Sequence, residues 1–207
     1  MSRIELHNID CLPYMKQCSD KQFDLAIVDP PYGISGHKQR VFDDGKRWDY
    51  EIPSHEYFQE LQRISVNQII WGGNYFPDLW KDGCKGFVVW DKRQPEGLTF
   101  AMIEMAWTSF DIPAKLFFTK PAGERGFYTV DCKRIHPTQK PIELYKWLLH
   151  IYAKPGDKII DTHLGSGSIA LACEEYGFDL TATEIDQEYF AAASKRLSDY
   201  RVQMRLF

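Results

Sequence analysis

The hydrophobic residues of this chain fall into short unbroken runs separated by longer stretches with helical spacing. Runs of four to seven residues that are apolar almost throughout are typical of strands buried on both faces of a sheet. We expect strands at 4–7 (IELH), 24–28 (DLAIV), 67–71 (NQIIW), 86–90 (GFVVW), 104–110 (EMAWTSF), 115–119 (KLFFT), 158–161 (KIID) and 179–184 (DLTATE). The 104–110 and 115–119 strands are expected near an edge of the sheet.

Helical patterns lie between many of these runs. We expect helices at 54–61 (SHEYFQEL), 141–153 (PIELYKWLLHIYA), 166–177 (SGSIALACEEYG) and 187–200 (QEYFAAASKRLSDY). Ser54 suits an N-cap, and Pro141 suits a first helical turn, where its missing N–H costs nothing. Strands separated by helices predict an α/β fold with a doubly wound, mostly parallel sheet.

The length of 207 residues suits one domain, 1–207. Residues 91–139 are poor in helical pattern and rich in glycine, proline and aromatic residues, so they are a candidate for a short non-core insertion. No apolar run approaches the ~18 residues of a membrane span, and no signal peptide is recognisable. The five cysteines lack a CxxC spacing, which favours a reducing, cytoplasmic location.

The net charge of -4 argues against a nucleic-acid coat protein, whose affinity rests on many phosphate contacts. It leaves room for an enzyme with a local basic face. Two stretches, 37–48 and 115–134, are locally basic. Their candidate nucleic-acid contacts are Lys38, Arg40, Lys46, Arg47, Lys120, Arg125 and Lys133, although such runs are more often solvated loops.

A glycine-rich turn follows the strand at 158–161. Gly165 to Ala170 fits GxGxxA, and Glu184 ends the next strand 19 residues later. In this fingerprint the glycines allow a ligand close to the backbone, and the acid binds a ribose diol. Nicotinamide, flavin and S-adenosylmethionine sites share it. Asp161, just before the turn, favours S-adenosylmethionine because a carboxylate there suits an ammonium better than a pyrophosphate.

The strand at 24–28 is followed by DPPYG. Two prolines cannot extend a central strand, so the strand ends at Asp29, where the ligand crevice of an open sheet lies. A carboxylate and the Pro30 carbonyl can accept the two N–H bonds of an exocyclic amine and aim its lone pair at a methyl group. Pro30 and Pro31 hold that carbonyl rigid, and Tyr32 offers a ring on which a base can stack.

Together, DPPYG (29–33), HPTQKP (136–141) and the later glycine loop resemble the amino-methylating DNA methyltransferases, in the permuted group whose catalytic motif precedes the cofactor motif. The resemblance implies a Rossmann-like fold and the cofactor S-adenosylmethionine. It assigns catalysis to residues 29–32. To the cofactor it assigns Asp10, Asp29, His136, Thr138, Lys140, Asp161, Gly165, Gly167, Ser168 and Glu184.

Two of these assignments have alternatives, and the chain departs from the family pattern at one place. Asp10 could instead cap the helix that holds Leu12 and Met15, and the HPTQKP residues could cap the helix that Pro141 opens. Thr162 and His163-Leu164 stand where the family usually has proline and an aromatic residue. That departure leaves the glycines intact.

The resemblance implies transfer of a methyl group to N6 of a flipped-out adenine in DNA, with no metal and no covalent intermediate. It links aspartate in this motif mostly with adenine and serine with cytosine N4. Cytosine N4, RNA and protein remain alternative targets. An oxidoreductase, suggested by GSGSIA alone, leaves DPPYG unexplained. The 91–139 insertion is the expected target-recognition region, and its shortness suggests a small site, a homodimer partner or low specificity. A cognate restriction endonuclease is a further partner to consider.

Overall fold

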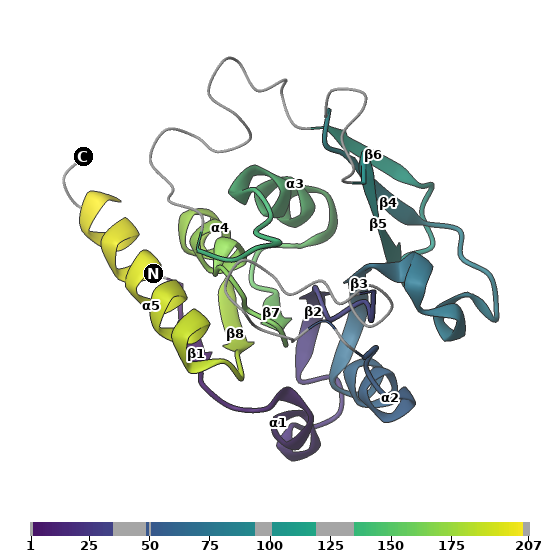
Figure 1. The fold of residues 1–207 in the computed structure, drawn as a ribbon, viewed down its shortest axis with the longest axis horizontal. Helices are drawn as coiled ribbons and strands as arrows, with labels where there is room; N and C mark the ends of the chain where they lie inside the picture. Colours follow the sequence, from purple (N-terminus) through teal and green to yellow (C-terminus); the bar gives the residue numbers. More distant parts are fainter. Residues whose placement is uncertain (1, 35–48, 50, 94–100, 119–134, 205–207) are drawn as a thin grey trace.

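The computed structural model describes residues 2–34, 49, 51–93, 101–118 and 135–204. Within them, eight strands form one sheet in the order β1-β8-β7-β2-β3-β5-β4-β6 (Figure 1). The strands are β1 (Ile4–His7), β2 (Phe23–Val28), β3 (Ser65–Trp71), β4 (Phe87–Asp91), β5 (Ile103–Thr108), β6 (Lys115–Phe118), β7 (Lys158–Asp161) and β8 (Asp179–Thr183). Each expected strand is present, with bounds shifted by one or two residues.

The sheet is parallel from β1 to β3 and mixed beyond it. β5 runs antiparallel to both β3 and β4, and β6 is parallel to β4. The order of the strands reverses between β7 and β2. The chain goes from β2 outward to β3, and from β7 outward to β8 in the other direction. Ligands of open α/β sheets bind at such a reversal, at the carboxyl ends of the strands.

Helices cover both faces of the sheet (Figure 1). One face carries α1 (Cys11–Gln17) and α2 (His55–Ile64), and the other carries α3 (Ile142–Tyr152) and α4 (Ser168–Tyr176). The last helix, α5 (Gln187–Met204), packs beside α4. Two short 3₁₀ turns, η1 (Gly73–Tyr75) and η2 (Pro77–Trp80), follow β3. The expected doubly wound, mostly parallel α/β fold is therefore confirmed.

β2 shows why the central strands are apolar throughout. Leu25 and Ile27 pack with α3 and α4, while Ala26 and Val28 face α1 and α2. All four are at most 1% exposed. Burying each Leu, Ile or Val side chain contributes about 1.5–3 kcal/mol, so both faces hold the strand in place. This fixes the position of Asp29, the next residue along the chain.

Local signals set the ends of the helices. The Ser54 hydroxyl accepts a hydrogen bond from the Tyr57 amide, which confirms the predicted N-cap of α2. Gly177 ends α4 in the left-handed conformation, at φ 78°. The Asp186 carboxylate accepts from the Glu188 and Tyr189 amides in the first turn of α5 and so caps the start of that helix.

Part of the expected insertion, 91–139, belongs to the sheet. β5 lies between β3 and β4, and β6 forms the edge. The two strands expected near an edge therefore join the sheet, and periodicity, which predicts a strand, does not give its neighbours. Residues 94–100 and 119–134 of the segment lie outside the described part of the chain, and its role in target recognition stays a prediction.

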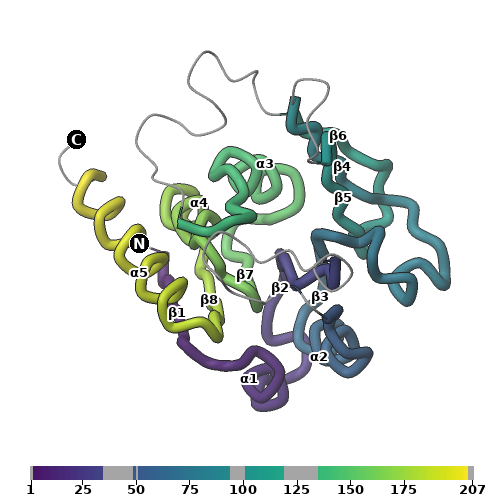
Figure 2. The backbone as a smooth tube through the Cα atoms, in the orientation of Figure 1, coloured from purple at the N-terminus to yellow at the C-terminus, as the bar shows by residue number. Residues whose placement is uncertain are grey.

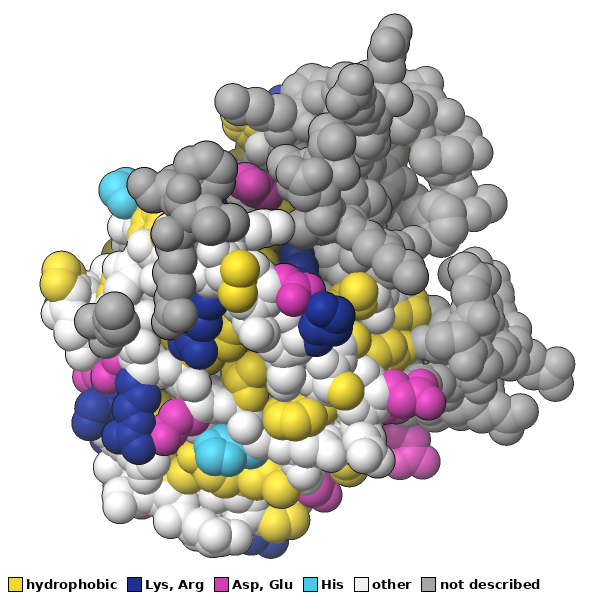
Figure 3. All heavy atoms as spheres, turned by 90° about the vertical axis from the view of Figure 1, so that its left-hand side faces the viewer, with side chains coloured by type: hydrophobic (Ala, Val, Ile, Leu, Met, Phe, Trp, Pro, Cys, Tyr) yellow, Lys and Arg dark blue, Asp and Glu magenta, His cyan; other side chains and the backbone are white. Residues whose placement is uncertain are grey.

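Two general surface properties follow from the described residues. None of their helices combines the length and the apolar character needed to cross a bilayer. On the face that includes α5, basic side chains lie among acidic ones and do not gather in one patch (Figure 3).

Candidate active site

The strand reversal brings two aspartates to one edge of the sheet. Ala26 of β2 is in register with Ile160 of β7, so Asp29 and Asp161 both stand where their strands end. The segments that carry them are more than 100 residues apart in sequence and lie side by side in space (Figure 2). The structure thus joins the DPPYG motif to the glycine loop, as the sequence predicted.

Asp29 has two close partners. Its Oδ2 lies 2.5 Å from the Lys140 ammonium, and its Oδ1 accepts a 2.5 Å hydrogen bond from the Tyr32 hydroxyl. The Lys140 side chain is 2% exposed and that of Asp29 is 17% exposed. The lysine therefore lies behind the carboxylate, and the carboxylate is open to a ligand.

Burial dominates the protonation of this cluster. It raises the pKa of Asp29, an effect that Lys140 opposes and nearby Glu104 reinforces. Burial would lower the pKa of Lys140, but the two carboxylates outweigh it, so the lysine stays charged. Burial and the Asp29 charge raise the pKa of Tyr32, which keeps its hydroxyl a donor.

The backbone of DPPYG is held by a residue from a separate loop. The Asp49 carboxylate accepts from the Tyr32 amide at 2.5 Å and from the Gly33 amide at 3.0 Å. Gly72 packs against the Tyr32 ring so closely that a Cβ would lie 2.2 Å from a ring carbon. Tyr75 stacks on the same ring, with centroids 5.1 Å apart. A base that stacks on Tyr32 must therefore share or displace the contact with Tyr75.

The glycine loop is built as expected. Gly165 and Gly167 adopt positive φ values of 51° and 72°, which favour glycine. The Gly165 amide donates to Glu184 Oε2 at 2.9 Å. The Ser168 hydroxyl donates to the Lys140 carbonyl at 2.7 Å, so the loop and the HPTQKP segment are directly connected. Arg196 of α5 reinforces the turn by donating to the Ser166 carbonyl at 2.8 Å.

Asp161 differs from Asp29 in its surroundings. Its side chain accepts a 3.0 Å bond from the His163 amide, and among the described residues no ion pair to it is formed. Burial is the main cause that raises its pKa to about 8, and the charges of Asp29 and Glu184 add to the effect. A buried carboxylate without a cation is suited to a ligand that brings an ammonium group.

His136 and Thr138 lie beside the glycine loop. A Cβ on Gly165 would stand 3.8 Å from the His136 ring, whose other neighbour is the Tyr189 ring at 4.3 Å between centroids. The Thr138 amide donates to His136 Nδ1 at 3.3 Å. His136 thus lies beside the glycine loop, Thr138 and His136 order the turn before α3, and a cofactor contact by either residue stays a prediction.

Asp10 serves as the N-cap of α1, where its carboxylate accepts from the Leu12 amide at 3.0 Å. This is the alternative that the sequence raised for it. Because β1 and β8 are paired, the residues after β1 also lie near Glu184: Asn8 donates to the Glu184 carbonyl at 2.8 Å. A cofactor contact by Asp10 stays a prediction.

The departures from the family pattern form a buried polar chain. The Tyr57 hydroxyl lies 2.6 Å from Thr162 Oγ1, which lies 2.9 Å from His163 Nδ1. Burial lowers the pKa of His163 to about 4, so the imidazole is neutral near pH 7. His163 therefore packs as an uncharged ring, edge-on against Tyr57.

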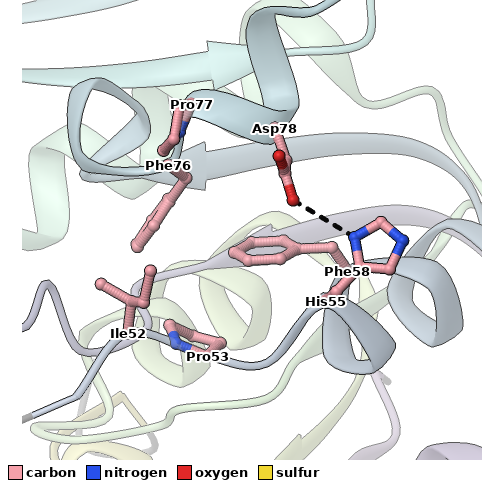
Figure 4. Close-up of a pocket in the computed structure, with 7 residues that line it drawn as sticks. All are labelled: Ile52, Pro53, His55, Phe58, Phe76, Pro77 and Asp78. Carbon is pink, nitrogen blue, oxygen red and sulfur yellow. Dashed lines mark hydrogen bonds and ion pairs between the residues drawn. The ribbon is translucent and has the colours of Figure 1, made fainter.

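A separate, mostly apolar cavity of about 130 Å³ lies beside the DPPYG loop (Figure 4). Its walls are Ile52, Pro53, His55, Phe58, Phe76, Pro77 and Asp78. His55 and Asp78 form an ion pair of 3.2 Å at its rim. Ile52 contacts Gly33, and Phe76 packs edge-on against Tyr32. The cavity walls support the motif, and neither Asp29 nor Asp161 lines them.

Sequence reasoning missed three residues of the site. Glu104 forms ion pairs with Lys140 and with Lys92, and Asp49 fixes the DPPYG backbone. The only available signal for Glu104 was a charge within an apolar strand. The predicted nucleic-acid contacts at 38–47 and 120–133 lie outside the described residues. Of the remaining candidates, all but Asp10, Pro30 and Pro31 take part in the contacts described above for the DPPYG motif and the glycine loop.

The fold and the two loops define a Rossmann-like enzyme of the methyltransferase type. A family model described as "DNA methylase", for N6 and N4 amino-methylating enzymes, matches residues 90–195, about half of the chain. The chain belongs to this family, and the expected amino-methylating DNA methyltransferase is confirmed at that level.

Individual proteins agree with this placement. The chain is 22% identical to type II methyltransferase M.HinfI of Haemophilus influenzae, over 93% of this chain and 67% of that protein. It is 23% identical to M.HpaI of Haemophilus parainfluenzae, over 88% and 70%.

Solved structures show the same fold. The M1.HpyAVI–SAM complex matches with a TM-score of 0.65 at 24% identity, over 93% of this chain and 99% of that one. The cytosine-N4-specific PvuII DNA methyltransferase matches with a TM-score of 0.65 at 12% identity, over 97% and 92%.

Proposed function

We propose that this protein transfers the methyl group of S-adenosylmethionine to N6 of an adenine in DNA. The observation that carries the proposal is the juxtaposition of Asp29 and Asp161 at the strand reversal. One carboxylate is paired with Lys140 and open on one side, and the other is buried and forms no ion pair with any described residue. The first suits an amine substrate and the second suits the ammonium of the cofactor.

The residues present fit S-adenosylmethionine. Asp161 would hold the ammonium of its methionine part, and Glu184 would hold its ribose. Both Glu184 oxygens already accept a backbone amide, from Gly165 and Asp186, each at 2.9 Å. Each oxygen keeps a second lone pair for a ribose hydroxyl, since a carboxylate has about four acceptor sites. The space above Gly165 is open, because a Cβ built on this glycine would lie 3.8 Å from its nearest neighbour, the His136 ring.

Asp29 would orient the amine. The bound cofactor supplies a methyl group on a sulfonium, which is electrophilic. The carboxylate accepts one N–H bond of the amine, and the Pro30 carbonyl accepts the other, which directs the nitrogen lone pair outward. Tyr32 and Lys140 occupy one acceptor site on each Asp29 oxygen and keep the carboxylate from rotating. Fixing this geometry is the main contribution of the protein, because a misplacement of ~1 Å can cost about 100-fold in rate.

Adenine is preferred to cytosine because the motif carries aspartate and not serine at position 29. The test is to incubate duplex DNA with isotopically labelled S-adenosylmethionine, digest it and identify the labelled nucleoside. We expect the label in N6-methyl-2′-deoxyadenosine. Label on cytosine alone would overturn the choice of base, and label on RNA but not on DNA would overturn the choice of substrate.

The path of the DNA and the protein partners are also proposals. DNA enters from the side on which Asp29 is exposed, with the 38–47 and 120–133 basic residues as its phosphate contacts. A homodimer or a cognate restriction endonuclease would add the recognition surface that a short segment lacks. Mapping modified bases in the DNA of an expressing host gives the recognised sequence and shows how strict it is.

A further inference from the structure

Four charged side chains form a row that ends at Asp29. Lys92 Nζ lies 2.5 Å from Glu104 Oε1, Glu104 Oε2 lies 3.1 Å from Lys140 Nζ, and Lys140 Nζ lies 2.5 Å from Asp29 Oδ2. The signs alternate along the row, and its net charge is zero. Glu104 stands on β5 and Lys92 directly follows β4, so the antiparallel part of the sheet reaches the active site through this row.

Lys140 has no freedom to leave this row. Its ammonium lies 5.2 Å from the centre of the Trp71 ring, and its side chain is 2% exposed. An ammonium has three donors. The Lys140 ammonium donates to the Tyr32 hydroxyl at 3.3 Å and lies within ion-pair distance of Asp29 and Glu104. Any change in how strongly Lys140 binds Asp29 must therefore come from its other partners, and Glu104 is the charged one.

The reaction makes this sharing necessary. When the methyl group moves, the nitrogen–carbon bond forms, and the sulfur–carbon bond breaks with its electron pair left on sulfur. The amine then carries a positive charge until it loses a proton to Asp29 or to water. A cationic Lys140 bound to Asp29 alone would oppose that charge and would compete with the amine for the carboxylate. Glu104 offsets the lysine charge from the other side.

We propose that Glu104 is a positioning residue that shares Lys140 with Asp29 and so keeps Asp29 available to the amine. This inference rests on the proposed role of Asp29. The residue acts through Lys140 and does not itself touch the substrate.

The decisive variant is Glu104→Gln, which keeps the shape and removes the charge. We expect the single-turnover rate to fall by about 10- to 100-fold, because the buried Lys140 ammonium loses the carboxylate that offsets its charge, and we expect the dissociation constant of S-adenosylhomocysteine to stay within about twofold. Because the charge of Glu104 raises the pKa of Asp29, its removal should move the acid limb of the pH–rate profile to lower pH. A purely structural residue would lower the melting temperature without that shift.

Other titratable groups also face Asp29, and they must be considered in reading the profile. Three are tyrosines: Tyr32 in the DPPYG loop, Tyr57 on α2 and Tyr145 on α3. The others are Asp161 at the end of β7, Glu104 on β5 and Lys140 just before α3. The three tyrosines have raised pKa values and stay neutral over the working range. Only the carboxylates can contribute an acid limb.

A second variant should shift the acid limb in the opposite direction, and it gives a test that stands if Glu104→Gln fails to fold. In Lys92→Gln, Glu104 keeps its whole charge for Lys140, so the acid limb should move to higher pH. Lys92 is 15% exposed and less demanding to replace. Glu104→Asp should restore part of the lost rate. The matched control is Glu56→Gln, at the exposed ion pair with Lys16, which should leave the rate and the profile unchanged.

The outcomes separate this inference from the proposed function. An unchanged rate and profile in Glu104→Gln overturns the inference, as does a rate loss without a shift of the acid limb, or shifts of the same sign in the two variants. If Asp29→Asn also transfers methyl groups at the wild-type rate, the assignment of Asp29 fails first. An inactive Asp29→Asn beside a normal Glu104→Gln overturns only the inference.

Discussion

Asp29 and Asp161 are two buried carboxylates at the ends of neighbouring strands, and the protein treats them differently. Asp29 is paired with Lys140 and accepts from Tyr32. Asp161 accepts one backbone amide, and burial raises its pKa to about 8. A buried charge is costly unless it is paired, so among the described residues Asp29 has its own cation, whereas Asp161 would gain from a cationic ligand.

The difference indicates how one sheet edge can serve two ligands. A carboxylate whose charge is already compensated can accept a neutral donor, such as an amine, without a large change in electrostatic energy. A carboxylate without a partner gains most from a ligand that is itself charged. The proposed division of the two aspartates between substrate and cofactor therefore rests on this pairing pattern more than on the residue type.

The largest effect is expected from Asp29→Asn. The asparagine amide has no negative charge to pair with Lys140, and it offers one acceptor oxygen instead of two. We therefore expect the rate of methyl transfer to fall by at least ~1000-fold, as happens when a catalytic group that orients a reacting atom is removed. Binding of S-adenosylhomocysteine should remain within about tenfold. Single-turnover assays and calorimetry measure the two quantities.

A matched control for this variant is Asp199→Asn, at the exposed pair with Lys195 on α5. It should retain full activity. If Asp29→Asn lost cofactor binding and methyl transfer to the same degree, the division of labour between the two aspartates would be wrong.

The next effect concerns Asp161 and pH. Below its pKa of about 8 the free side chain is protonated, and the ammonium of the cofactor requires the carboxylate, so binding should release a proton. The bound state holds fewer protons, and the affinity for S-adenosylhomocysteine should rise with pH, by up to about tenfold per unit between pH 6 and 7.5. Calorimetry in buffers with different ionisation heats counts the released protons.

Asp161→Asn should make the affinity independent of pH in this range and reduce it at pH 7.5 by about 10- to 100-fold, the value of a hydrogen bond to a charged group. The rate at saturating cofactor should change much less than in Asp29→Asn. A wild-type affinity that is flat with pH, without proton release, would show that Asp161 is already ionised in the free protein.

Most of the fold and half of the site could be predicted from the chain, because both depend on local patterns. The apolar run before Asp29 predicts a buried strand, the prolines predict its end, and the spacing from Gly165 to Glu184 predicts the cofactor half. Lys140 was assigned to the cofactor through the resemblance alone. The structure places its ammonium on Asp29, and a contact of Lys140 with the cofactor stays a prediction.

The missing part depends on contacts between distant segments. Glu104 meets Lys140 because β5 inserts antiparallel between β3 and β4, and periodicity contains no information on the order of strands. Asp49 accepts from the DPPYG amides, and it stands in a stretch with several other acidic residues. The sequence alone does not show which of these acids makes the contact. Such pairings require the tertiary structure.

The smallest effect is expected from Tyr32→Phe, which keeps the ring and removes one donor from Asp29. A hydrogen bond to a charged group contributes about 1.5–3 kcal/mol, but Lys140 still holds the other Asp29 oxygen, so we expect the rate to fall by no more than about 10-fold while stacking of the base persists. The Tyr32 bond lowers the pKa of Asp29, and its loss should move the acid limb to higher pH, in the direction opposite to Glu104→Gln. Tyr200→Phe, at the exposed bond to Glu175, is the matched control. A loss of 100-fold without a shift would mean that the hydroxyl contacts the substrate, and that Asp29 relies on Lys140 alone for its orientation.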